Sequence, residues 1–192
     1  ALTDPGLWRL LVITSLVVLG VDLLQFYIPI YGHGIGLSAS AIGSVLAASA
    51  SASFVVRIVL PRMVARLSAE KVLAYSFALG AASYFMVPFF QTTVELALVG
   101  FVFGLGMGCG QPVTIMLTFS NSASGRSAEI LGLRMTAAHL ARVLGPIAFG
   151  SIGSAFGLFP VFWANALLLA VGGMLSHPGK SADAGSSRAG RR

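Results

Sequence analysis

Six continuous apolar runs, each about twenty residues long, constrain what this chain of 192 residues can fold into. A helix needs about 20 apolar residues to cross the hydrocarbon core of a bilayer. A membrane barrel instead uses strands of about ten residues in which apolar and polar positions alternate. The sequence therefore predicts an all-α integral membrane bundle of six transmembrane helices. The predicted spans are 7–31, 39–60, 72–90, 94–118, 128–154 and 158–175. Pro61 is expected to end the second helix, because proline has no amide hydrogen to donate.

The composition agrees with a chain embedded in lipid, and the placement of the charges predicts an orientation. Apolar residues make up 56% of the chain and charged residues only 9%, whereas a soluble domain has roughly a quarter charged residues. Lysine and arginine gather before the first run, in the second and fourth connections, and after the last run. Cytoplasmic loops collect these residues, so both termini are predicted to be cytoplasmic. Residues 1–178 form the predicted membrane unit, and 179–192 are expected to be a disordered basic tail.

Several other function classes lack the residues that they would need. The net charge of +6 is explained by the cations that gather at the predicted cytoplasmic ends of the runs. These cations form no basic surface large enough to follow the phosphates of a nucleic acid. Cys109 is the single cysteine, so no internal disulfide or multi-cysteine metal site is possible. His33, His139 and His177 are far apart in the sequence and form no cluster. No metal, cofactor or enzyme active site is therefore expected.

Asp22 is the strongest candidate for a functional side chain, because it lies near the middle of the first run. Ser15, Asp22, Gln25 and Pro29 follow a spacing that places them close to one helical face. Pro29 cannot donate to the carbonyl of Gln25, which leaves that acceptor free for water or a solute. Acidic side chains inside a membrane usually face an interior and act there. We expect Asp22 to carry protons; the alternative is a structural hydrogen bond to a neighbouring helix.

The fifth run contains two arginines on one helical row, Arg134 and Arg142. Arg134 is close enough to the cytoplasmic end to reach water by snorkelling. Arg142 lies near the midplane, at a depth similar to that of Asp22, and Pro146 frees its carbonyl one turn later. We therefore predict that Asp22 and Arg142 face one cavity and pair. His139 lies on another side of this helix and is expected to serve packing or hydrogen bonding.

Glycine and proline interrupt the fourth and fifth runs. Gly100, Gly104 and Gly108 form a stripe at every fourth residue, which lets helix backbones approach closely. Gln111 follows this stripe and is a candidate cavity-lining residue; Pro112 after it frees the carbonyl of Gly108. The small residues 47–53 of the second run predict another close-packing surface.

Gly145 and Pro146 weaken the outer half of the fifth helix. Such an element is suited to a hinge, and a passive kink is the alternative interpretation.

The order of these features resembles the C-terminal half of a major facilitator superfamily transporter, with bacterial efflux members as the most similar branch. The shared features are six helices with both ends inside, a basic second connection, Gln-Pro in a glycine-rich fourth helix, and Gly-Pro in the fifth. In that family a motif Gly-x-x-x-Asp-Arg-x-Gly-Arg-Arg follows the second helix of a half. Residues 57–66 align with it: Arg62 and Arg66 match, whereas Pro61 and Ala65 replace an aspartate and an arginine.

The resemblance implies both a function and partners. Helices one, two, four and five of a half line the central cavity in that family, which places Asp22, Gln25, Gln111, Arg134 and Arg142 on cavity-lining helices. The expected activity is secondary active transport of a small organic solute across the inner membrane by alternating access, as proton-coupled efflux. The family has twelve helices, so a missing N-terminal half or a second copy is expected as a partner within the bilayer. The alternative is a membrane scaffold or assembly partner that transports nothing.

Overall fold

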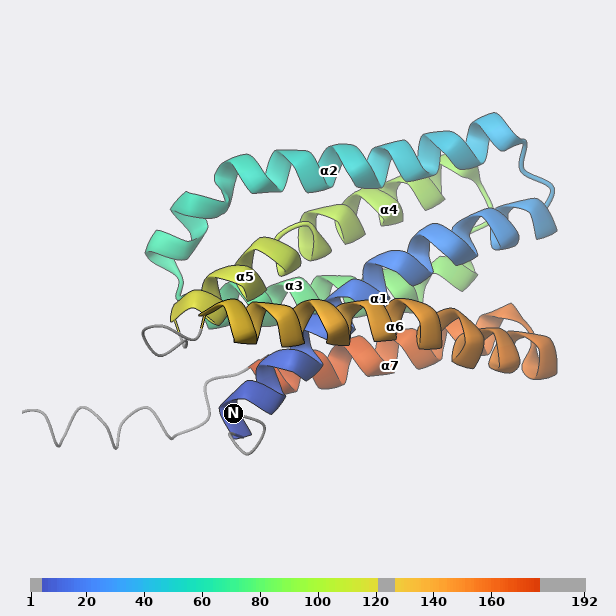
Figure 1. The fold of residues 1–192 in the computed structure, drawn as a ribbon. Helices are drawn as coiled ribbons and strands as arrows, with labels where there is room; N and C mark the ends of the chain where they lie inside the picture. Colours follow the sequence, from blue (N-terminus) through green and yellow to red (C-terminus); the bar gives the residue numbers. More distant parts are fainter. Residues whose placement is uncertain (1–4, 121–126, 177–192) are drawn as a thin grey trace, which may run out of the picture.

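The computed structural model describes residues 5–120 and 127–176, and this part of the chain is a bundle of helices (Figure 1). No strand occurs in these two ranges, which confirms the predicted all-helical bundle. The helices are α1 (Pro5–Gly34), α2 (Ala39–Arg66), α3 (Ala69–Met86), the short 3-10 helix η1 (Val87–Phe89), α4 (Thr93–Met107), α5 (Gly110–Ser120), α6 (Ser127–Phe156) and α7 (Leu158–Ser176). The predicted tail at 179–192 lies outside the described residues.

Local chemistry explains where the helices begin and end. The hydroxyl of Ser38 accepts a hydrogen bond from the amide of Ala41 at the start of α2. Thr92 and Glu95 form a capping box at the start of α4, in which each side chain accepts from the other residue's backbone amide. Such caps satisfy amides that have no partner inside the helix. Gly157 separates α6 from α7 with a φ of 85°, a left-handed conformation that glycine adopts without strain.

One predicted helix boundary was wrong, and one predicted span contains a break. Pro61 does not end the second helix, because α2 continues through it to Arg66. Proline removes only one hydrogen bond, to the carbonyl of the residue four positions earlier, and the rest of the helix persists around it. The fourth run is not one uninterrupted helix either: it breaks between Met107 and Gly110 into α4 and α5. Pro112 removes a hydrogen bond at this break, and the adjacent glycines favour an irregular backbone.

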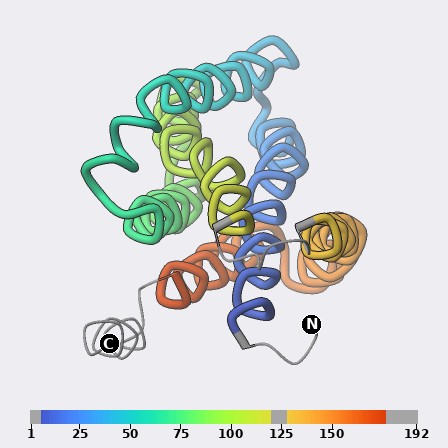
Figure 2. Tube along the Cα trace, turned by 60° about the vertical axis from the view of Figure 1, so that its left-hand side comes forward, coloured from blue at the N-terminus to red at the C-terminus, as the bar shows by residue number. Residues whose placement is uncertain are grey.

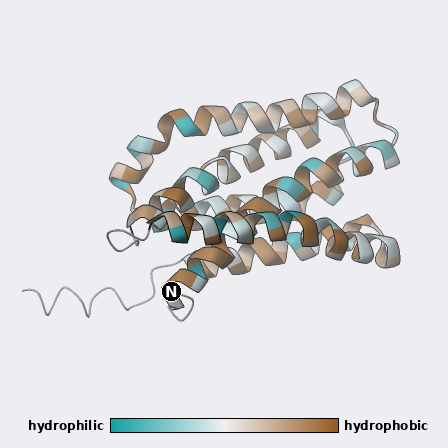
Figure 3. Ribbon diagram, viewed as in Figure 1, coloured by the Kyte–Doolittle hydropathy of each residue, from teal (hydrophilic) through white to brown (hydrophobic). Residues whose placement is uncertain are grey.

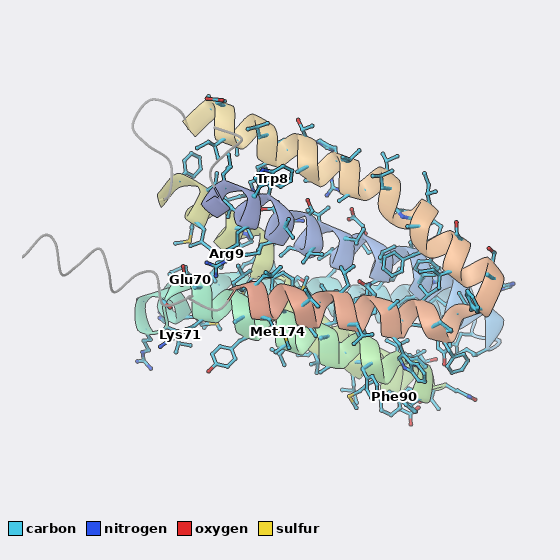
Figure 4. The ribbon with its side chains drawn as sticks, turned by 90° about the horizontal axis from the view of Figure 1, so that it is seen from below. Trp8, Arg9, Glu70, Lys71, Phe90 and Met174 are labelled. Atoms are coloured by element: carbon cyan, nitrogen blue, oxygen red, sulfur yellow. The ribbon has the colours of Figure 1, made fainter. Side chains whose placement is uncertain are left out.

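The start of α1 and the end of α7 lie at the same end of the bundle (Figures 1 and 4). The Nε atom of Arg9 donates to the carbonyl of Leu175 over 2.6 Å, which joins the start of α1 to the end of α7. Glu70 and Lys71 of α3 lie at this same end, and Phe90 lies at the opposite one (Figure 4). Arg9 and Lys71, two of the cations that the sequence assigns to one side of the membrane, therefore share one end of the bundle.

A buried apolar core holds α1, α3, α4 and α7 together. Leu23, Phe77, Phe162 and Leu169 are completely buried there. Tyr84 is also buried, and its hydroxyl donates to a backbone carbonyl of α1 over 2.6 Å. In the tube view α2 and α6 lie at the rim on different sides of this core (Figure 2). Both α2 and α6 also contribute buried residues to the core, and each keeps exposed apolar residues on another face.

The helices have the apolar surface that a bilayer requires. Apolar residues extend along them, and hydrophilic positions interrupt α1 and α6 (Figure 3). Within the described residues, five segments are long and apolar enough to cross a membrane: Gly6–Gly34, Ala39–Arg66, Ala69–Phe89, Thr93–Phe119 and Leu158–Ser176. The sixth predicted span, α6, is not among them, although it has 30 residues. Its polar residues Arg134, His139 and Arg142 lower its mean hydropathy.

Candidate functional site

An ion pair connects α1 and α6 through the two charges that the sequence placed at similar depth. The Nε atom of Arg142 lies 2.8 Å from Oδ2 of Asp22 and donates a hydrogen bond to it. The Asp22 side chain is 28% exposed and that of Arg142 is 45% exposed. Both groups thus remain accessible from outside the described bundle. In this position the carboxylate can exchange the guanidinium for a proton, and the guanidinium can then bind another anion.

The backbone around Gly145 brings α6 close enough to α1 for this pair to form. A Cβ atom at Gly145 would collide with the side chain of Leu19. A larger residue there would require the end of the Leu19 side chain to move. Pro146 lies inside α6 and does not end it, and the helix changes direction in its second half (Figure 4). Whether this bend acts as a hinge remains a prediction.

A cavity of about 680 Å³ lies between α1, α2, α4 and α5. Its polar lining residues are Gln25, Ser49, Ser53, Arg57 and Gln111. Its apolar lining residues include Leu24, Phe54, Phe103 and Met107. A volume of roughly 300–1,000 Å³ with a few polar groups on apolar walls is typical of sites for small molecules. The cavity therefore has the size and lining of a binding site for an organic solute.

Arg57 connects the two sides of this cavity. Its Nε atom donates to the carbonyl oxygen of Gly108 over 3.2 Å. That carbonyl lies four residues before Pro112, which has no amide hydrogen with which to satisfy it. The arginine of α2 thus replaces the hydrogen bond that proline removes from the α4–α5 segment.

The glycine stripe allows α2 to approach α4 closely enough for this bond. A Cβ atom at Gly100 would lie 3.2 Å from the carbonyl oxygen of Val45, and one at Gly108 would lie 2.7 Å from the Cα of Ser53. At Gly104 the Cβ would overlap the carbonyl of Ser49. The stripe and the small residues of α2 therefore pack directly on each other. Without this close contact, Arg57 could not reach the α4–α5 break.

Arg134 is turned into the protein, and the expectation that it snorkels to water was wrong. The residue is only 5% exposed. Its Nη2 atom donates to the hydroxyl oxygen of Thr114 over 3.0 Å, and that hydroxyl donates to the carbonyl of Gln111 over 2.8 Å. Its Nε atom is buried and has no hydrogen-bond partner within the described residues. The polar face of α5 thus offers a nearer partner than the end of the bundle.

The structure divides the predicted site residues into separate groups. Gln25, Gly108 and Gln111 line the cavity. Asp22 and Arg142 pair with each other but are not among the cavity-lining residues. A helix that lines the cavity therefore does not turn all its polar side chains toward it: α1 presents Gln25 to the cavity and Asp22 to α6.

The sequence did not predict that Arg57 lines the cavity, and Arg57 was counted among the cations around the second connection. Two signals mark it: it lies inside an apolar stretch, and it is a charge whose own carbonyl is freed by Pro61. Arg62 and Arg66 are exposed at the last turns of α2.

Long apolar helices packed around a cavity define the chain as a multi-pass membrane protein. The family model described as Major Facilitator Superfamily matches residues 10–191. The chain therefore belongs to the major facilitator superfamily, a family of membrane transporters and not of enzymes. No curated protein sequence matches the chain.

Proposed function

We propose that this chain is one half of a secondary active transporter that expels a small organic solute in exchange for protons. The ion pair between Asp22 and Arg142 is the observation that carries the proposal. Its charges lie on two membrane helices, where an ionisable side chain costs at least about 2.5–3.5 kcal/mol at the bilayer centre. Such a cost is usually met where an ion or solute passes. Val21, Leu24 and Gln25 of the same helix α1 line the cavity.

Alternating access requires a second set of helices opposite this cavity. Exposed cavity-lining residues such as Gln25, Phe54 and Arg57 point to a surface that another six-helix unit covers. That unit is an N-terminal half or a second copy of the chain. In this arrangement protonation of Asp22 would release Arg142 and loosen the contact between α1 and α6. The proposed location is the inner membrane, with both termini of the chain on the cytoplasmic side.

The experiment measures proton movement that depends on a solute. The intact gene product, together with an N-terminal half where the gene encodes one, is reconstituted in liposomes that enclose the pH-sensitive dye pyranine. Labelled organic anions, neutral compounds and cations are then added in turn under an imposed pH gradient. We expect one of these groups to accumulate against its gradient with a matching change in dye signal. Asp22→Asn should abolish the coupled signal, because the amide cannot carry the proton.

The matched control is Glu70→Gln, which removes the same charge at the end of the bundle, away from the cavity and the ion pair (Figure 4). It should leave coupled transport unchanged. A wild-type chain that moves none of these solutes would favour a membrane scaffold instead. Full proton coupling in Asp22→Asn would remove the carboxylate from the mechanism and contradict the proposal.

A further inference from the structure

The charge balance of the cavity indicates which class of solute it accepts. The cavity is lined by one cation, Arg57, and by no aspartate or glutamate. The acidic side chain next along α1, Asp22, is already paired with Arg142. A charge that faces an apolar cavity is costly unless an opposite charge accompanies it. Within residues 5–120 and 127–176, Arg57 has no acidic partner.

The guanidinium of Arg57 is held in place while part of it stays free. Its Nε atom donates to Gly108, and in the described residues its two Nη atoms have no hydrogen-bond partner. The bond to Gly108 fixes the direction of the planar group. Arginine presents parallel N–H donors that match the two oxygens of a carboxylate. The structure thus holds an oriented anion-binding group at a cavity wall.

The neighbouring residues fit the rest of an organic anion. The amides of Gln25 and Gln111 line the same cavity and can donate further hydrogen bonds to oxygen atoms. Phe54, Phe103 and Met107 supply apolar walls. An inorganic anion would leave these walls in contact with water, whereas an apolar group would fill them.

We infer that the cavity binds organic anions that join a carboxylate to an apolar or aromatic group, and that Arg57 is the residue that binds the carboxylate. This inference deepens the proposed function, because it names the solute class of the same cavity. Arg57 has two tasks: one nitrogen stabilises the α4–α5 break and the others bind the solute. A useful substitution of Arg57 therefore removes the charge but keeps the hydrogen bond to Gly108.

Three probes of the same size and shape test the inference: benzoate is anionic, benzamide is neutral and benzamidine is cationic. Binding to the full chain is measured by titration calorimetry in nanodiscs of neutral phosphatidylcholine at fixed salt. We expect benzoate to bind at least about tenfold more tightly than benzamide, as hydrogen bonds to a charged group imply. Benzamidine should bind most weakly. Equal binding of benzoate and benzamide, a preference for benzamidine, or no binding of any probe would overturn the inference.

Arg57→Gln removes the charge but keeps an N–H group that can donate to Gly108. It should bring the affinities for benzoate and benzamide to within about twofold of each other. Lys71→Gln removes a charge from the exposed start of α3 and should keep the benzoate preference. A preference that survives in Arg57→Gln would overturn the inference.

A second variant leaves Arg57 and its bond intact. Ala50 is exposed and lines the cavity on α2, so Ala50→Glu adds a carboxylate to the wall. It should reverse the order of benzoate and benzamidine; an unchanged order would overturn the inference even if Arg57→Gln does not fold.

Binding in nanodiscs needs neither a gradient nor a second half. If benzoate is not preferred but proton coupling still depends on Asp22, only this inference is overturned. The opposite result overturns only the proposed function.

Discussion

Gly104 offers the most direct test of how the cavity is built, because it lies where α4 contacts the backbone of α2. A Cβ atom on Gly104 would overlap the carbonyl of Ser49 and lie 2.9 Å from the Cβ of Ala52. Neither neighbour can rotate away, since one is backbone and the other is attached directly to it. Gly104→Ala therefore forces α2 away from α4.

The size of the effect follows from comparison with a glycine that has space. Inserting a methyl group into a packed contact costs about 1–3 kcal/mol. Replacing a helical glycine by alanine also returns about 0.5–1 kcal/mol through backbone entropy. Gly43 of α2 has no atom within 4 Å of its hypothetical Cβ, so Gly43→Ala gains the backbone-entropy stabilisation without the cost of a clash. The two variants should differ by about 1–3 kcal/mol in the free energy of unfolding, with Gly104→Ala less stable.

Unfolding by SDS, followed by far-ultraviolet circular dichroism in one detergent, measures this difference. We expect Gly43→Ala to unfold at a higher SDS fraction than wild type and Gly104→Ala to unfold at a lower one than Gly43→Ala. Equal midpoints for the two alanine variants would refute the close approach of α2 and α4. The position of Arg57 at the α4–α5 break would then lose its structural basis.

Two further substitutions test buried hydrogen bonds. Tyr84→Phe removes the hydroxyl that donates to α1 and should lower the unfolding free energy by about 0.6–1.7 kcal/mol in the same SDS titration; no loss would show that the bond adds nothing. Thr114→Val removes the acceptor of the buried Arg134 and should cost about 1–3 kcal/mol. Thr14→Val, at a buried threonine of α1 whose hydroxyl has no hydrogen-bond partner within the described residues, is the control, and an equal cost in both variants would contradict a special role for the Arg134 contact.

The length of the apolar runs was enough to predict the class of fold. The depth of a residue along a membrane helix follows from counting, so Asp22 and Arg142 could be placed at the same level. The partner of a side chain also depends on how each helix is rotated about its axis. Arg134 was assigned to the end of the bundle because its sequence position permits snorkelling, but α5 presents Thr114 at a shorter distance.

Arg57 illustrates what sequence reasoning leaves out. Its contact with Gly108 depends on an unbroken α2 beyond Pro61 and on the close approach of two small-residue surfaces. Each surface is readable alone, since glycine and serine stripes favour packing. Which surface faces which is decided by the whole bundle. The carbonyl freed by Pro112 was visible in the sequence, but its donor comes from a residue 51 positions earlier.

The hydrogen bond from Arg9 to Leu175 has a consequence for anything attached to the bundle. A domain fused before α1 and a domain fused after α7 are therefore attached at neighbouring points of the bundle. The two fragments of a split fluorescent reporter, one at each end, would meet on the same molecule and glow in a single compartment. Mechanical force applied through both attachments would shear the first helix from the last before it reached the cavity.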